Sequence, residues 1–202
     1  MVSTSTWYDV DFSVGIPEIG RSDYNFDSYS IPWEAPKVII LKDTTVSIIK
    51  VIEFEEGFRS TPYLCSEDFV TIGYGTKLHK AQGMDPSSFL VEVDRTVAGA
   101  WLQKELDKIQ DRISASDYYS KIFYSLNEDR QSMILNMGYQ LGVTGLYNFK
   151  NMWAALKTED YNKAATEALD SRWAKQTPER AERVAEVIRS GSMDEVYKRF
   201  TN

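Results

Sequence analysis

Apolar residues recur at helical spacing through most of the second half of the chain, and this pattern limits the fold more than any other feature. In DRTVAGAWLQKELDKIQDRI the apolar positions fall on one side of a helix, which predicts a helix of roughly 18 residues from Asp94, over about 94–112. The members of that face are Val97, Trp101, Leu102, Leu106 and Ile109. Four further helices are predicted at about 127–141, 146–157, 160–174 and 178–190, and SMDEVYKRF predicts a short terminal helix. The chain is therefore expected to be mainly helical.

The segment that precedes this helical region combines a short helix with a small sheet. Asp43 is a plausible N-cap of a helix that ends near Gly57, with apolar residues between them at helical spacing. Residues 58–78 are rich in turn formers and β-branched residues, which predicts a short hairpin sheet. We expect residues 43–93 to form a small lobe, the helix over 94–112 to be a connection, and residues 113–202 to form a helical lobe.

Residues 1–42 differ in composition from the rest of the chain. They contain seven aromatic residues and three of the six prolines, and their apolar residues alternate with polar ones in WYDVDFSVGI. This period of two predicts a strand, and KVIILK is a second strand candidate. Two interpretations stay open. The segment is either a small β-rich appendage packed by its own aromatics or an extended arm that becomes ordered on a partner.

Composition excludes several classes of function. The net charge of −7 and the pI near 4.9 argue against nucleic acid as a partner, because phosphate binding needs clustered Lys and Arg. The sequence predicts no membrane-spanning segment, and the first residues lack the features of a secretory signal, so we expect a soluble protein made in a cytoplasm. A single cysteine permits no internal disulfide, and a lone histidine excludes the usual zinc spacings, so no metal is expected.

One loop carries the residues of greatest chemical interest. In EEGFRSTPYLCSEDFVTIGYGTKLH, Glu56 precedes a glycine, and Cys65 and Thr71 follow it on the predicted hairpin. Hydrolysis of a glycosidic bond with inversion needs one acid and a second group that orients water, and this loop can supply both. The simpler alternative is that Glu55 and Glu56 are a solvated charge pair, Cys65 packs as a small apolar residue, and Thr71 is an ordinary strand residue.

The wider sequence resembles the phage-type lysozymes, or endolysins. The loop with Glu56, Cys65, Thr71 and TIGYG resembles their catalytic loop, LNEDRQSMILNMGYQLGVTGLYNFKNM resembles their central buried helix, and ALDSRWAKQTPERAERVAEVIRSG resembles their penultimate pair of helices. These motifs occur in the family's order and cover residues 44–200. The resemblance implies an α+β, mainly α, two-lobed fold with a small β-sheet lobe, a long connecting helix and a helical C-terminal lobe.

The resemblance also implies roles for the loop residues. Glu56 would be the general acid, Cys65 would take the position of the second catalytic group, and Thr71 would help to hold the attacking water. Arg180 matches an arginine that pairs with the catalytic glutamate, although it could instead be an exposed helix residue.

Four further positions match residues that contact the saccharide in this family. They are Gly75, Tyr139, Gln140 and Arg172. Gly75 could equally serve only the turn, and Tyr139 could be a core residue. We expect Asn136 to bond to buried backbone rather than to substrate.

Three features depart from most of the family. Cys65 stands where most members have aspartate, although a subgroup with cysteine exists. Thr76 stands where many have histidine, so an ion pair of that histidine is expected to be absent. The chain is acidic where many relatives are basic, so long-range attraction to an anionic wall should be weak.

The implied activity is that of a glycoside hydrolase that cuts the β-1,4 bond between N-acetylmuramic acid and N-acetylglucosamine in peptidoglycan. The enzyme would act without a cofactor, as a monomer, on the glycan strands of the bacterial cell wall during phage lysis. It would wait in the host cytoplasm and act in the periplasm, or travel in the virion, with a virion or host protein as a possible partner of residues 1–42. The alternatives are a catalytically weak wall-binding or virion structural protein on the same fold, and a chitin or chitosan hydrolase.

Overall fold

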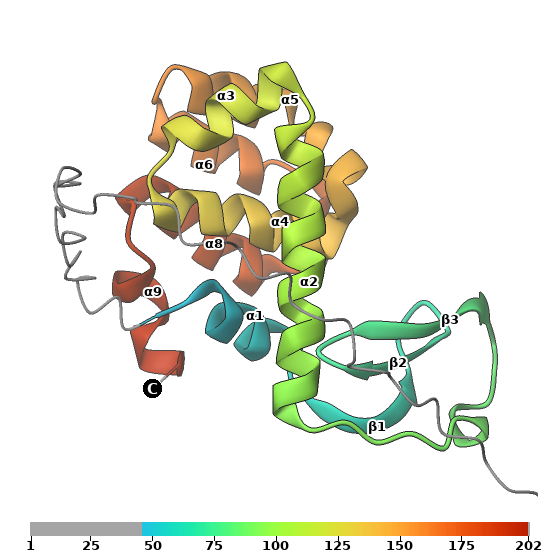
Figure 1. Cartoon of the computed structure of the whole chain (residues 1–202). Coiled ribbons are helices and arrows are strands. Elements are labelled where there is room, and N and C mark those ends of the chain that lie inside the picture. The colour runs from blue at the N-terminus through green and yellow to red at the C-terminus, as the bar shows by residue number, and fades with distance from the viewer. Residues whose placement is uncertain (1–45, 202) are drawn as a thin grey trace, which may run out of the picture. The chain divides into compact units, whose positions relative to one another are not determined.

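The computed structural model of the protein describes residues 46–201, which lie within one compact unit, Leu41–Asn202 (Figure 1). The two strands predicted before residue 43 lie outside the described residues, as does Asp43. The predictions for residues 1–42 therefore stay predictions.

The first described helix, α1 (Ile48–Glu56), leads into a small sheet. Its N-cap is Ser47, whose hydroxyl accepts a hydrogen bond from the Lys50 amide, so the prediction of Asp43 as the cap was wrong. The helix ends where Gly57 takes a positive φ of 68°. The sheet that follows is antiparallel, in the order β1-β2-β3, with strands β1 (Arg59–Leu64), β2 (Phe69–Gly73) and β3 (Thr76–Gln82).

A long helix, α2 (Arg95–Ser114), follows the sheet and a single 3₁₀ turn, η1 (Pro86–Ser88). The Asp94 carboxylate caps α2 by accepting a hydrogen bond from the Val97 amide at 2.8 Å. Val97, which shares the helical spacing of the apolar residues in this helix, is 41% exposed. The buried face of α2 consists of Ala98, Leu102, Leu106, Ile109 and Ile113. In Figure 1, α2 extends from the sheet to the other helices.

Seven helices after α2 form the helical lobe in the described part of the chain. They are α3 (Asp117–Ser125), α4 (Glu128–Tyr147), α5 (Lys150–Lys157), α6 (Tyr161–Leu169), α7 (Arg172–Gln176), α8 (Pro178–Ser190) and α9 (Met193–Thr201). The sequence pattern did not predict α3. The single helix expected over 160–174 is two helices, because the Ser171 hydroxyl accepts a hydrogen bond from the Ala174 amide and starts a new helix.

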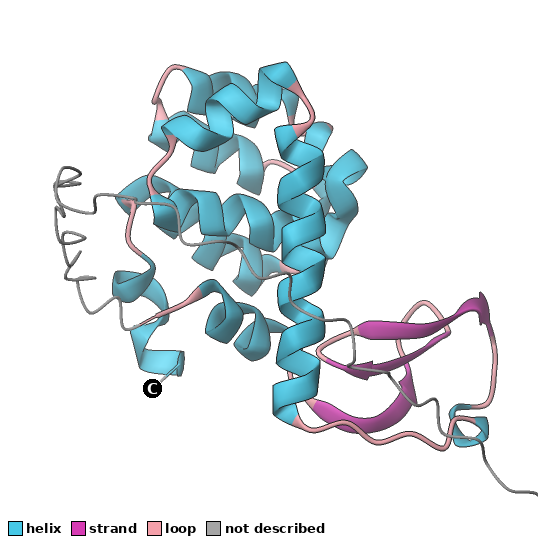
Figure 2. Cartoon of the chain, viewed as in Figure 1, coloured by secondary structure: helices cyan, strands magenta, loops and turns pink. Residues whose placement is uncertain are grey.

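Helix α4 lies at the centre of the helical lobe and contacts α1, α2, α3 and α8. Its middle section is buried, and Gly142, at φ 69° and ψ 159°, puts a kink in it that few other residues could adopt. Gly138 lets α4 approach α2 closely, since a Cβ there would lie 2.7 Å from Cγ2 of Ile109. Figure 2 shows the resulting segregation of helices from one small sheet, which confirms the predicted α+β, mainly helical architecture.

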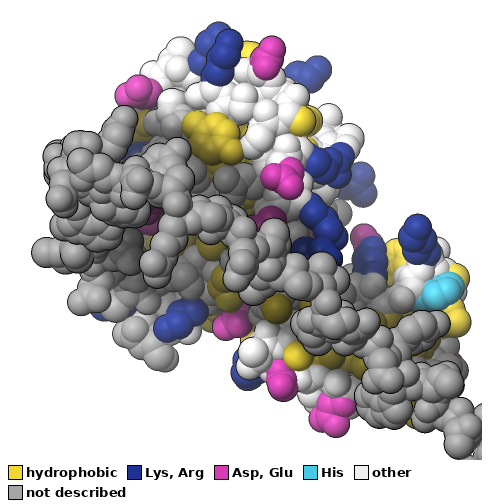
Figure 3. Space-filling model, in the orientation of Figure 1, with side chains coloured by type: hydrophobic (Ala, Val, Ile, Leu, Met, Phe, Trp, Pro, Cys, Tyr) yellow, Lys and Arg dark blue, Asp and Glu magenta, His cyan; other side chains and the backbone are white. Residues whose placement is uncertain are grey.

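The surface on the face shown in Figure 3 has a local concentration of positive charge. Lys and Arg side chains gather there beside α2 and the neighbouring end of the sheet. The chain as a whole carries a net charge of −7. None of the helices between residues 46 and 201 is long and apolar enough to cross a bilayer.

Candidate active site

Glu56 is the last residue of α1, and its carboxylate is held by an arginine from α8. Nη1 of Arg180 donates to Oε1 of Glu56 at 2.6 Å, and the side chain of Arg180 is only 6% exposed while that of Glu56 is 24% exposed. The arginine is fixed in turn by α4, because its Nε donates to Oδ1 of Asn136 at 2.9 Å. A buried guanidinium with two such partners has little freedom, so it gives Glu56 a defined position.

Two alternatives considered for these residues are wrong. Arg180 is not an exposed helix residue, and the side-chain oxygen of Asn136 bonds to the arginine rather than to buried backbone. Sequence reasoning therefore missed Asn136 as part of the site. Its buried place in the middle of an apolar helix was the available signal, because a buried polar side chain needs a partner.

Glu55 is buried on a different side of α1, so the hypothesis of a solvated Glu55–Glu56 pair is also wrong. Its side chain is 3% exposed and makes a forked ion pair with Arg183, from Nε to Oε1 at 2.9 Å and from Nη2 to Oε2 at 2.7 Å. The Tyr197 hydroxyl of α9 donates to the same carboxylate at 2.9 Å. Adjacent residues on a helix are about 100° apart, which separates the two carboxylates. Of these two carboxylates, only that of Glu56 is exposed enough to meet a substrate.

The sheet brings Cys65 and Thr71 together. Cys65 directly follows β1, its amide donates to the Phe69 carbonyl at 3.0 Å, and Tyr63 and Thr71 are partners across β1 and β2. Side chains two residues apart on a strand share a face, so Tyr63, Cys65 and Thr71 lie on one side of the sheet. This alternation was the signal that could have identified Tyr63, which the sequence analysis missed.

Tyr63 lies within the electrostatic reach of both Glu56 and Cys65. Burial raises the pKa of the Tyr63 phenol, Arg59 opposes that rise, and the negative forms of Glu56 and Cys65 add to it. The pKa of this phenol therefore depends on both the carboxylate at the end of α1 and the thiol beside β1.

The surroundings of Cys65 favour its thiolate form. Burial acts to raise the pKa of the thiol, but the amides of Glu67 and Phe69, the Thr71 hydroxyl and the charge of Lys77 together lower it below its ordinary value. The Thr71 hydroxyl donates to the Phe69 carbonyl at 2.9 Å. Because a hydroxyl has one proton, Thr71 must turn away from that carbonyl to donate to a thiolate or to a water molecule.

Gly75 and Tyr139 lie beside Glu56. Gly75 has a φ of 94°, which strongly favours glycine, and a Cβ there would be 3.7 Å from Oε2 of Glu56 and 3.9 Å from the Tyr139 hydroxyl. The Tyr139 hydroxyl donates to the Tyr74 carbonyl at 2.7 Å, and burial raises the pKa of this phenol strongly, with the Glu56 carboxylate adding to the rise. Tyr139 is partly buried, so one part of its side chain packs against the core and another part lines a pocket.

Gln140 and Arg172 lie on the helical lobe. The side-chain oxygen of Gln140 accepts a hydrogen bond from Nε1 of Trp173 at 2.6 Å, which joins α4 to α7. Arg172, the first residue of α7, lines a pocket of about 580 Å³ together with Phe149 and Trp173. Both are surface residues, and within residues 46–201 neither makes a hydrogen bond or an ion pair with Glu56, Cys65 or Thr71.

The candidate site consists of the Glu56 carboxyl group, which Arg180 holds in place, the Cys65 thiol, whose pKa is lowered, and the Thr71 hydroxyl of the sheet. Such a site can donate a proton to a leaving oxygen and orient a water molecule. Among residues 46–201, no group of three or more His, Cys, Asp and Glu side chains is placed to hold a metal ion.

Comparison with known proteins agrees with this geometry. Residues 53–189 match the phage lysozyme family. The chain is 27% identical to the pre-baseplate central spike protein Gp5 of enterobacteria phage T4, over 85% of this chain but only 33% of that protein. It is 26% and 24% identical to the probable T4-type lysozymes 1 and 2 of Dictyostelium discoideum, over 75% of this chain and 98% of each of them. Because the family match covers more than half of the chain and includes the whole candidate site, the chain belongs to the phage lysozyme family.

Proposed function

We propose that this protein is a lysozyme that hydrolyses the β-1,4 bond between N-acetylmuramic acid and N-acetylglucosamine in peptidoglycan. The observation that carries the proposal is the partly exposed Glu56 carboxyl group, fixed by the buried Arg180 at the end of the helix that leads into the sheet with Cys65 and Thr71. Membership of the family supports a lysozyme-like function, and the bond and the substrate are the finer part of the proposal.

In the proposed reaction Glu56 donates its proton to the glycosidic oxygen as the bond to the sugar carbon breaks. A water molecule held by Thr71 and Cys65 adds its oxygen to that carbon and passes a proton to the thiolate. The amides, the hydroxyl and the ammonium group that lower the pKa of Cys65 would stabilise this thiolate. A second proton transfer returns the two groups to their starting states.

The remaining predicted residues would bind the glycan strand. Gly75 leaves room next to Glu56 for a sugar ring, and Tyr139 lines the pocket beside it. Gln140 and Arg172 would bind further along, on the helical lobe, where Arg172 lines its own pocket. Aromatic and hydrogen-bonding side chains of this kind are suited to sugars.

The test compares two adjacent glutamates. Glu56→Gln should abolish release of soluble fragments from purified peptidoglycan and leave the protein folded, because the amide keeps the shape of the side chain and its oxygen can still accept from Arg180. Glu55→Gln is the matched control. It should retain turnover and lower the free energy of unfolding by about 1 to 3 kcal/mol, since it weakens a buried bond to a charged partner. Turnover by Glu56→Gln with loss of turnover in Glu55→Gln would contradict the assignment of the acid.

A second candidate is a structural or wall-binding protein of a virion that uses the same fold with little turnover. The similarity to a central spike protein favours it, because 85% of this chain aligns with part of that protein. Analysis of the fragments released from peptidoglycan and from chitin separates the candidates. Release of muramic acid-containing fragments supports the lysozyme, release from chitin alone supports a chitin hydrolase, and binding without release supports the structural role.

A further inference from the structure

A pocket of about 660 Å³ lies between β3 and α2, beside the candidate active site. One wall is the turn before β3 and the start of β3 itself, from Gly75 to Leu78. The other wall is a face of α2 that carries Trp101, Lys104, Glu105 and Lys108. These positions are three, four and seven residues apart from Trp101, which is the spacing of one helix face. We call this the lysine pocket.

The lysine pocket is positively charged although the chain is acidic. Its lining includes three lysines, Lys77, Lys104 and Lys108, and one acid, Glu105. The Lys108 ammonium lies 2.8 Å from Glu105, and both side chains are at least half exposed. Such surface pairs stabilise little, so the Lys108 ammonium can turn toward a ligand at small cost.

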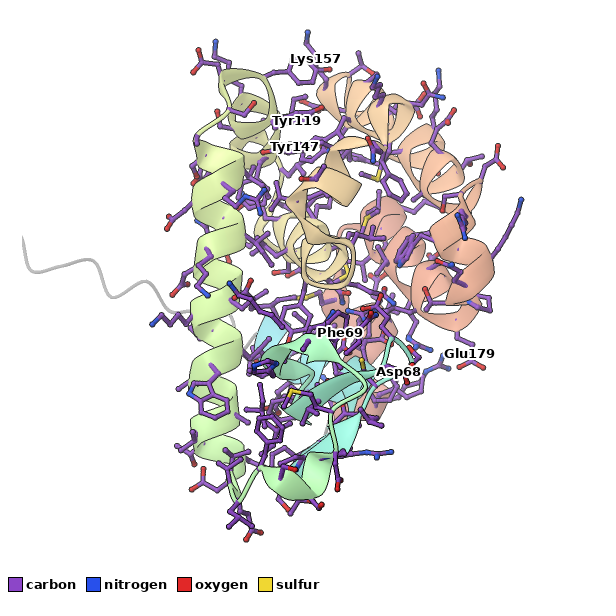
Figure 4. The ribbon with its side chains drawn as sticks, turned by 90° about the vertical axis from the view of Figure 1, so that its right-hand side faces the viewer. Asp68, Phe69, Tyr119, Tyr147, Lys157 and Glu179 are labelled. Carbon is purple, nitrogen blue, oxygen red and sulfur yellow. The ribbon has the colours of Figure 1, made fainter. Side chains whose placement is uncertain are left out.

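The two other lysines are also available. In the part of the chain that the structure describes, Lys104 is exposed and makes no hydrogen bond or ion pair. Lys77 pairs with Glu67 at 2.8 Å on the surface and lies over the Phe69 ring, 3.8 Å from its centre. Figure 4 labels Phe69 on the sheet, and Figure 3 shows positive side chains gathered beside α2 in this part of the molecule.

The lysine pocket adjoins the proposed site of reaction. Gly75 and Tyr139 line it, and a Cβ on Gly75 would lie 3.7 Å from Oε2 of Glu56. A ligand whose sugar lies at Glu56 can therefore extend a substituent into the pocket. Trp101 is partly buried there and offers an apolar surface for such a substituent.

We propose that the lysine pocket binds an anionic substituent of the glycan strand, namely the carboxylates of an acidic peptide attached to the sugar beside Glu56. The proposal rests on the proposed function, because it names the part of the same substrate that lies next to the bond to be cut. Ammonium groups attract carboxylates and phosphates alike, so phosphate groups of other wall polymers share the chemistry. Salt screens charges that are more than about 10 Å apart, so the nearby lysines act on a bound anion more strongly than the distant acids do. A protein with a net charge of −7 can therefore still bind an anionic polymer at this pocket.

The first experiment measures binding without turnover. The full-length Glu56→Gln variant is sedimented with purified peptidoglycan sacculi, and the bound fraction is measured as a function of salt. Adding Lys104→Ala and Lys108→Ala should weaken binding about 3- to 10-fold at low salt, and the difference should disappear near 1 M salt, where the screening length is about 3 Å. Replacing both lysines by arginine should retain binding, because the charges stay.

The matched control removes two lysines elsewhere. Lys121 and Lys157 line a different pocket, on α3 and α5, so Lys121→Ala with Lys157→Ala makes the same change in net charge. This control should bind sacculi as the parent variant does. An equal loss of binding in both pairs would show a general charge effect and overturn the proposal, as would no loss in the Lys104 and Lys108 pair.

Two treated substrates identify the anion. Sacculi whose carboxylates have been amidated should lose the lysine-dependent part of binding, and sacculi stripped of phosphate polymers by hydrofluoric acid should keep it. The reverse result assigns the pocket to phosphate and overturns the peptide assignment. Hydrolysis by the unmodified protein is assayed in parallel. Lysine-dependent binding without hydrolysis would count against the proposed function alone, whereas hydrolysis without lysine-dependent binding would count against this inference alone.

Discussion

Cys65 poses the main chemical question at the scale of single residues, because a neutral thiol is a poor base. Its pKa is lowered by two amides, the Thr71 hydroxyl and the Lys77 charge, which together outweigh the effect of burial. These neighbours stabilise the thiolate, which is the form that can accept a proton from water. This is the role that an aspartate would fill with a far lower pKa.

The lowered pKa predicts that this cysteine is alkylated at a lower pH than an ordinary cysteine. The rate of reaction with iodoacetamide follows the thiolate fraction, so it should rise with a midpoint below about 8.5, the pKa of an ordinary cysteine. The same protein unfolded in denaturant is the control, because the thiol then loses its partners. A midpoint in the folded protein at or above that of the unfolded protein would contradict the stabilised thiolate.

Substitutions at Cys65 separate catalysis from packing. If the thiolate activates water, Cys65→Ala should lower kcat on peptidoglycan by about 10² to 10⁴-fold, and Cys65→Asp should retain most of it. Cys65→Ser keeps the size and polarity but has no accessible anion, so it should behave like the alanine variant. Near-normal kcat in Cys65→Ala together with a lower melting temperature would show that the residue only packs.

At the scale of elements, α8 holds the end of α1 with two arginines. Arg180 binds Glu56 and Arg183 binds Glu55, and the two arginines are three residues apart on one face of α8. Helix α9 completes the contact, because Tyr197 donates to Glu55. Carboxylates at the C-terminal end of a helix are unfavourable by themselves, so these partners are what make the pair of glutamates stable there.

Tyr197 should make the protein sensitive to alkali. Burial, with the neighbouring Glu55 carboxylate, raises the pKa of Tyr197 well above its ordinary value of 10.0. A raised folded pKa gives stability that is full below the unfolded pKa and is lost as pH rises toward the folded one. The free energy of unfolding should therefore fall above about pH 10, by up to about 1.4 kcal/mol per pH unit from this residue.

Urea denaturation at several pH values between 9 and 11 measures this dependence. Tyr197→Phe should be less stable at neutral pH, because Glu55 loses a partner, but its stability should fall less steeply above pH 10. Parallel curves for the two proteins would show that Tyr197 does not resist ionisation. Other buried tyrosines are present in both proteins, so their effect cancels in the difference.

Local signals in the sequence predicted most elements, and the errors have local or long-range causes. Asp94 and the apolar period after it predicted the start of α2, because the capping hydrogen bond joins Asp94 to Val97, only three residues away. The break between α6 and α7 depends on one hydroxyl of Ser171, which competes with helical bonding and leaves the apolar period unchanged. Helix α3 has only nine residues, too few for a strong period.

The burial of Glu55 could not be predicted from its surroundings in the sequence. Its partners Arg183 and Tyr197 follow it by 128 and 142 residues, so its environment exists only after α8 and α9 pack. The position of Arg180 against Glu56 was predicted by resemblance and not by any local pattern. The support of Arg180 by Asn136 needed the structure, because it joins α4 to α8.

At the scale of the whole molecule, residues 46–201 contain every residue proposed for catalysis and binding. One apolar core extends from Val46 at their beginning to Tyr197 in α9, and it includes residues of the sheet and of each helix from α1 to α9. The network of Glu56, Arg180 and Asn136 needs no atom from outside this range. The described part is therefore expected to fold and act by itself.

This predicts that deletion of residues 1–42 leaves catalysis nearly unchanged. The truncated protein should hydrolyse soluble glycan fragments with kcat and KM within about 2-fold of the full chain, because every residue proposed for the site lies within residues 46–201. The seven aromatics of the deleted segment have most to gain by leaving water, so their removal should change solubility or binding to a partner instead. Both proteins should be assayed side by side at several enzyme concentrations. A large gain in kcat/KM after deletion would show that the segment inhibits the enzyme, and a large loss with an intact fold would show that it contributes to the site.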